Sequence, residues 1–151
     1  MKIFPLFALS AFFCGQQIFA APLAIETTLV DTDTFHGATF QSHNQKVVSN
    51  KRGIFMTRLR SRNEAYTAQQ WRLSWSRDGG RTVKTLYEAT DATSPPVIET
   101  DSADNNYVAR TDWPDLKNLN IYLSRFLSAG DCGEPHRTLI GEGAAGKHSM
   151  M

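Results

Sequence analysis

The chain has 151 residues, with 16 Lys and Arg against 15 Asp and Glu, so its formal net charge at pH 7 is +1. Such a balance gives no long-range field that would attract nucleic acid or an anionic membrane surface, so we expect neither partner. The length is that of one ordinary domain.

The start of the chain has the pattern of a cleavable secretory signal peptide over residues 1–21. Lys2 gives a positive start, residues 3–13 form an apolar run, and the small side chains of Ala20 and Ala21 mark a cleavage site. This apolar run is too short for a membrane-spanning helix, which needs roughly 20 residues. We therefore predict an exported protein, periplasmic, extracellular or at the cell surface, whose mature chain has no integral membrane segment.

Cleavage would leave residues 22–151 with equal numbers of basic and acidic side chains, because the removed segment contains one lysine and no carboxylate. It would also leave a single cysteine, Cys132, which cannot form a disulfide within the chain. His136 and His148 have no carboxylate or cysteine at the spacing typical of metal ligands. We therefore expect stability to come from packing, with no metal site and no cofactor.

Residues 22–151 have the pattern of an all-β protein. Short apolar and β-branched runs alternate with clusters of turn-forming residues, and helical periodicity is nearly absent. The predicted strands are Ala24–Val30, Lys46–Val48, Ile54–Arg60, Gln70–Ser76, Val83–Glu88, Val97–Thr100, Tyr107–Arg110, Ile121–Leu127 and Thr138–Ile140. The three strands that begin at Ile54 and the three that begin at Tyr107 have similar outlines about 50 residues apart, a spacing typical of repeated β-units.

The clearest motif is the turn sequence at residues 76–82, Ser-Arg-Asp-Gly-Gly-Arg-Thr, which follows an aromatic strand. Asp78 can accept hydrogen bonds from N–H groups of its own turn, and Gly80 and the glycine before it can adopt positive φ. Ser76 and Thr82 can tie the two strand ends together. The sequence therefore predicts a stapled hairpin with a structural role.

This turn resembles the Asp-box, or BNR repeat, of the sialidase superfamily, which joins the two outer strands of a β-propeller blade. Four positions match the pattern: Ser76, Asp78, Gly80 and Thr82. Val83 stands where that family usually has Trp or Phe. The resemblance implies a partial β-propeller over residues 22–151, with about two four-stranded antiparallel blades and the start of a third after the signal peptide.

The resemblance also implies a carbohydrate-related function, with a glycan as partner. Sialidases grip the substrate carboxylate with three arginines, the first in a Phe/Tyr-Arg-Ile-Pro motif, but the corresponding residues 43–48 contain neither Arg nor Pro. We therefore expect this chain alone to be inactive. Since a closed propeller needs about four blades of roughly 45 residues each, we also expect it to be the N-terminal portion of a longer protein.

Three alternatives remain open from the sequence. The complete protein could be an exo-sialidase-type glycoside hydrolase, or a polysaccharide lyase in which His36 or His43 acts as a base near neutral pH. The third alternative is a small exported β-domain with a binding or structural role.

The first candidate ligand-binding residues are Arg58 and Arg60, which lie two residues apart on a predicted strand and so point to the same face. Paired guanidinium groups suit the carboxylate of an acidic sugar. Such a cluster is also typical of a solvated face. Glu64 follows closely, roughly where sialidases carry an acidic residue.

The second candidate pair is Arg110 and Asp112, with Trp113 beside them. We expect this pair to lie close to Glu99 or Asp101 on a paired strand. A polar cluster next to a tryptophan is typical of sugar-binding sites, and a satisfied surface ion pair is the structural alternative.

Overall fold

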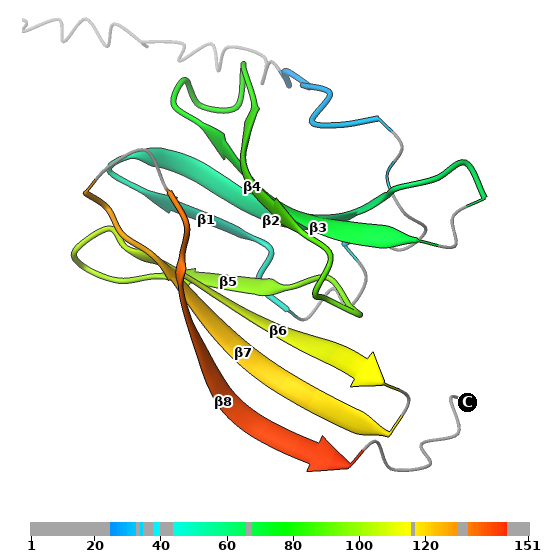
Figure 1. Ribbon diagram of the computed structural model, residues 1–151. Helices are drawn as coiled ribbons and strands as arrows, with labels where there is room; N and C mark the ends of the chain where they lie inside the picture. The colour runs from blue at the N-terminus through cyan, green and yellow to red at the C-terminus, as the bar shows by residue number, and fades with distance from the viewer. Residues whose placement is uncertain are drawn as a thin grey trace, which may run out of the picture.

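The computed structural model describes residues 25–32, 34, 38–39, 44–65, 68–115, 117–129 and 133–144 (Figure 1). These residues form eight β-strands and no helix, so the predicted all-β class is confirmed. Within this part of the chain there is accordingly no helix long and apolar enough to cross a membrane. The predicted signal peptide, His36, His43, Cys132 and His148 lie outside the described residues.

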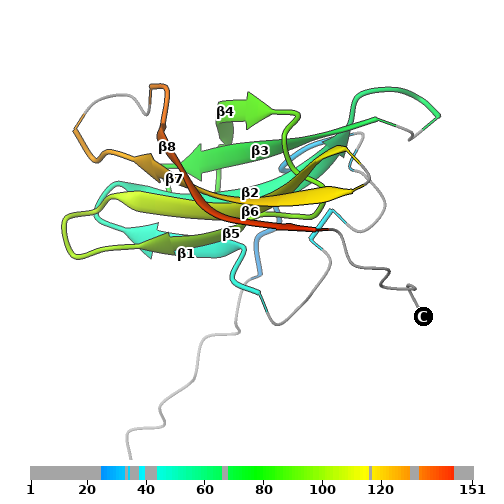
Figure 2. The same ribbon diagram turned by 60° about the horizontal axis from the view of Figure 1, so that its bottom comes forward.

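The strands form two separate four-stranded antiparallel sheets, each with its strands in sequence order. Sheet 1 contains β1 (Val47–Asn50), β2 (Gly53–Ser61), β3 (Gln69–Ser76) and β4 (Lys84–Ala89). Sheet 2 contains β5 (Val97–Thr100), β6 (Asn106–Asp115), β7 (Asn118–Phe126) and β8 (His136–Ala144). Figures 1 and 2 show the sheets as two layers, with β1 and β5 side by side.

The predicted strand at Ala24–Val30 is wrong for its described part, since residues 25–30 pair with no other strand. They form an extended strap on sheet 1, and Glu26, Thr28 and Val30 line a pocket there. Ile25 and Leu29 are instead 80% and 77% exposed. Alternate side chains of the strap therefore face the sheet with the two-residue period of a paired strand, but the apolar Ile25 and Leu29 are on the exposed side.

The second and third strands of each sheet pair in equivalent registers around an arginine. Arg58 of β2 pairs with Arg72 of β3, and Arg110 of β6 pairs with Tyr122 of β7. Each arginine donates a hydrogen bond to a serine two residues beyond its paired residue, Ser74 in sheet 1 and Ser124 in sheet 2. The spacing of about 50 residues in the sequence thus corresponds to a repeated structure.

The hydrophobic core lies between the two sheets. Sheet 1 contributes Phe55, Leu59, Trp71 and Leu73, all at most 2% exposed. Sheet 2 contributes Ile98, Val108 and Phe126, which are equally buried. The rings of Trp71 and Phe126 meet edge to face with centroids 6.5 Å apart, a favourable aromatic geometry. Each such side chain contributes roughly 1.5–3 kcal/mol through burial.

Polar contacts fix the edge where β1 and β5 meet. Lys46 is 8% exposed and donates from Nζ to the carbonyl oxygens of Pro95 and Pro96, at 2.7 and 3.2 Å. Thr57 Oγ1 donates to the same Pro96 oxygen at 2.7 Å. The connection between β4 and β5 is therefore held against sheet 1 before the chain enters sheet 2.

Candidate functional site

The turn at residues 76–82 is stapled by its own side chains. Ser76 Oγ donates to Asp78 Oδ1 at 2.8 Å and accepts from the Gly80 N–H at 2.8 Å. Thr82 donates to Asp78 twice, from its N–H at 2.9 Å and from its hydroxyl at 2.7 Å. Gly79 and Gly80 have φ values of 73° and 96°, which favour glycine. The turn thus holds the ends of β3 and β4 together.

These bonds also set the charge of the turn. The backbone N–H of Thr82, followed by the hydroxyls of Thr82 and Ser76, lowers the pKa of Asp78 to about 2. Asp78 therefore stays ionised over the ordinary pH range and serves as an acceptor. A carboxylate held in this way is a structural element.

The structure places Arg58 in a buried ion pair. Its side chain is 3% exposed, and Nη2 lies 2.7 Å from Asp31 Oδ2 at the end of the strap. Arg72 Nη1 lies 3.1 Å from the same oxygen, and Arg60 Nε lies 3.7 Å from Asp31 Oδ1. Burial raises the pKa of Asp31, but the hydrogen bond and charge of Arg58, with the charges of Arg72 and Arg60, bring it below its ordinary value.

Arg110 has the same arrangement in sheet 2. Its Nη2 lies 2.6 Å from Asp91 Oδ2, and its Nη1 donates to Ser124 Oγ at 2.7 Å. Asp91 also accepts from Trp71 Nε1 at 2.9 Å, which links the two sheets. Burial raises the pKa of Asp91, but hydrogen bonds from Arg110 and Trp71 outweigh burial and lower it below its ordinary value.

Asp91 therefore replaces the partners expected for Arg110. Glu99 pairs with Tyr107 across β5 and β6, and Asp101 accepts from the Tyr107 hydroxyl at 2.9 Å. The ion pair of Arg110 is mostly buried, and its guanidinium also stacks on Trp71 with 5.5 Å to the ring centroid. Asp112, the other residue of the predicted pair, is half-buried and lies opposite Asn120 in sheet 2.

Asp112 belongs to a row of polar side chains that crosses three strands. It pairs with Asn120 of β7, which in turn pairs with Glu142 of β8, so all three lie on one face. Asn120 and Glu142 of this row line a hollow of about 460 Å³ together with Pro114, Asn118, Gly143 and Ala144, and Asp112 continues the row beside it. In Figure 1 this end of β6, β7 and β8 projects beyond sheet 1. Trp113, 47% exposed, lies next to Asp112 in the chain.

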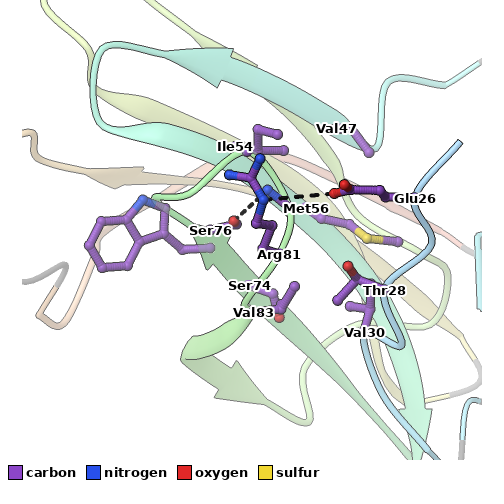
Figure 3. Close-up of a pocket in the computed structure, with 13 residues that line it drawn as sticks. Glu26, Thr28, Val30, Val47, Ile54, Met56, Ser74, Ser76, Arg81 and Val83 are labelled. Carbon is purple, nitrogen blue, oxygen red and sulfur yellow. Dashed lines mark hydrogen bonds and ion pairs between the residues drawn. The ribbon is translucent and has the colours of Figure 1, made fainter. Parts of the chain in front are cut away.

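A second pocket, of about 260 Å³, lies between the strap and sheet 1 (Figure 3). Its apolar lining consists of Val30, Val47, Ile54, Met56, Trp75, Val83. At its mouth Glu26 of the strap lies 3.7 Å from Arg81 of the Asp-box turn, and both side chains are mostly exposed. This pocket is on the side of sheet 1 that faces away from sheet 2.

The described residues hold no group of three His, Cys, Asp or Glu side chains that could bind a metal ion. Comparison of the chain with protein-family models, with curated proteins and with solved structures finds no match in any of the three. The function of each candidate site therefore has to be inferred from its chemistry and its place in the fold.

Proposed function

We propose that this chain is an exported protein of the sialidase-like BNR type, with a propeller-like arrangement of blades, that binds a carbohydrate without cleaving it. The binding site in this proposal is the hollow around Asp112, Asn120 and Glu142. The observation that carries it is the alignment of these three side chains across β6, β7 and β8 in a part of sheet 2 open to solvent.

The chemistry of the hollow suits a sugar. Sugar hydroxyls both donate and accept hydrogen bonds, and the hollow supplies the carboxylate of Glu142 as an acceptor and the amides of Asn118 and Asn120, which do both. Asn120 is already oriented, since its Nδ2 donates to the Tyr122 hydroxyl at 3.2 Å. Pro114 adds apolar surface to the lining of the hollow.

The arrangement of the two sheets supports the propeller part of the proposal. Each is a four-stranded antiparallel meander, and the Asp-box turn joins the third and fourth strands of the first. The buried arginine of each sheet lies on the face toward the preceding part of the chain, Arg58 toward the strap and Arg110 toward sheet 1. Consecutive blades of a propeller are stacked face to face in this repeating manner.

The same arginines support binding over sialidase-type catalysis. Arg58 and Arg110 are each neutralised by an aspartate, Asp31 and Asp91, and are at most 4% exposed. A guanidinium in such a pair is not available to grip the carboxylate of an acidic sugar, because releasing it would leave a buried charge unpaired. In this proposal Arg58 and Arg110 therefore have a structural role and do not contact the ligand.

The test is glycan-array screening of the chain, followed by calorimetric titration with any glycan that binds. Asn120→Ala and Glu142→Gln should each weaken binding by about tenfold, the effect of losing one or two hydrogen bonds. Arg62→Ala, which alters an exposed side chain in the loop between β2 and β3, is the control and should bind normally. Binding unaffected by both hollow variants would rule out this site.

A further inference from the structure

Among the described residues, each sheet has one face on which no other sheet packs, and the internal repeat relates these two faces. Val47 and Met56 of sheet 1 pair with each other in the same way as Ile98 and Val108 of sheet 2. Ile98 and Val108 are fully buried against sheet 1, whereas Val47 is 44% exposed beside the pocket under the strap. The strap side of sheet 1 is thus the equivalent of a surface that sheet 2 buries.

The far face of sheet 2, which points away from sheet 1, also has an equivalent face in sheet 1. By register, Ile121 and Leu123 of β7 correspond to Trp71 and Leu73 of β3. Trp71 and Leu73 are fully buried between the sheets, whereas Ile121 is 38% exposed and Leu123 is half-buried. This far face therefore repeats, in sheet 2, the surface that sheet 1 packs against its neighbour.

We infer that a second copy of this chain docks head to tail, with the far face of sheet 2 packed on the strap side of sheet 1. By register, the two faces are equivalent to those through which sheets 1 and 2 pack within one chain, and the strap, which already covers Arg58, would form part of the contact. The pocket lined by Val30, Val47 and Met56 would receive apolar side chains from around Ile121 (Figure 3). Leu29 of the strap, 77% exposed, adds to the apolar area that a partner would cover.

A contact between two different faces is heterologous, so repeated docking either closes a ring or continues as an open chain. A closed ring of sheets has no exposed apolar face, which is the usual way that propeller-like proteins avoid bare surfaces. The hollow at Asn120 lies at the projecting end of sheet 2 and would stay accessible in every copy. Several hollows in one assembly would strengthen binding to a repeated ligand.

The test is the molar mass of the full chain by light scattering and sedimentation over a range of concentrations, without any glycan. We expect a mass of two or more chains, and a single-chain mass throughout the range would overturn the inference. Met56→Arg and Ile121→Arg should each reduce the mass to that of one chain. Leu127→Arg, which places the same charge on another exposed apolar residue, should leave the mass unchanged.

Mixing the two variants tests the direction of docking. Each keeps one intact face, so an equal mixture of Met56→Arg and Ile121→Arg should form a complex of two chains and nothing larger. If Met56→Arg alone still forms a dimer, the two copies pack through the same face and the head-to-tail arrangement is wrong.

Hydrogen exchange on the unmodified chain gives a readout that does not depend on how well the variants fold. Residues 25–30 and 119–125 should exchange more slowly at high than at low protein concentration. Equal exchange at both concentrations would contradict docking even if the variants fail to fold. Neither this result nor the mass depends on the proposed sugar site.

Discussion

Arg110 Nη2 lies 2.6 Å from Asp91 Oδ2, and through this contact one carboxylate joins the two sheets. Asp91 belongs to the connection between β4 and β5, yet it accepts hydrogen bonds from Arg110 of sheet 2 and from Trp71 of sheet 1. Arg137 of β8 adds a third contact at 3.1 Å. A single side chain outside both sheets therefore adds a polar bridge to the hydrophobic packing between them.

Replacing Asp91 should destabilise the whole fold. Asp91→Asn leaves the guanidinium of Arg110, which is 1% exposed, without its counter-ion. Removing one partner of a buried pair costs about 3 kcal/mol in the free energy of unfolding. Urea denaturation followed by tryptophan fluorescence measures the loss. Glu134→Gln, an exposed neutralisation near the same sheet, should cost little, and equal losses for the two variants would contradict this role.

Acid should weaken the fold by protonating Asp31 and Asp91, the two carboxylates that neutralise the buried arginines. Because the pKa values of Asp31 and Asp91 lie below the ordinary value in the folded chain, the unfolded chain binds more protons in acid. Their stabilisation is complete above the unfolded pKa of about 4 and is lost as the pH falls through the lower folded values. The free energy of unfolding should therefore decrease below about pH 4. Asp91→Asn should flatten that decrease, and an unchanged slope would mean that other carboxylates cause it.

The effect of disrupting the turn at residues 76–82 should be local. Asp78→Ala removes the acceptor of both Thr82 bonds, so the amide of Thr82 should exchange with solvent faster and the melting temperature should fall. Hydrogen exchange measured by NMR detects the first effect. Thr82→Ser keeps both donors and should retain the slow exchange, so fast exchange in that variant would disprove the assignment of these bonds.

Gly53 should not tolerate a side chain. Its φ is +129°, and a Cβ there would come within 2.1 Å of the Ser76 carbonyl oxygen. Gly53→Ala should therefore destabilise the chain by about 1–3 kcal/mol, since both the backbone strain and the clash with β3 must be relieved. Chemical denaturation gives the value. Gly133→Ala, where no atom lies within 4 Å of the added Cβ, is the matched control and should be neutral within error.

Strand positions could be predicted from this sequence because short apolar and β-branched runs are separated by clusters of turn-forming residues. The ends of β6, β7 and β8 could not, because residues such as Asp112, Asn120 and Glu142 are polar and only backbone pairing extends the strands there. The strap shows the converse case. Its alternating side chains follow the period of a strand, but they pack on the face of sheet 1 without a pairing partner.

The partners of the candidate arginines were beyond sequence reasoning. Arg58 and Arg110 could be placed on strands, but Asp31 and Asp91 precede their sheets by different distances and have no motif around them. Which carboxylate reaches a buried arginine depends on how the connections cross the sheet face. The polar row could be found only in part, since Glu142 joins Asp112 through pairing between β7 and β8.

Each sheet carries its own arginine and serine and takes its aspartate from the connection that leads into it. Each unit of roughly 50 residues therefore supplies the carboxylate that neutralises its own buried arginine. A gene duplication that inserted one more such unit after β4 would bring a matched acceptor with every new guanidinium. Chains of this type can thus lengthen or shorten by whole units in evolution without ever passing through an intermediate that buries an unpaired arginine.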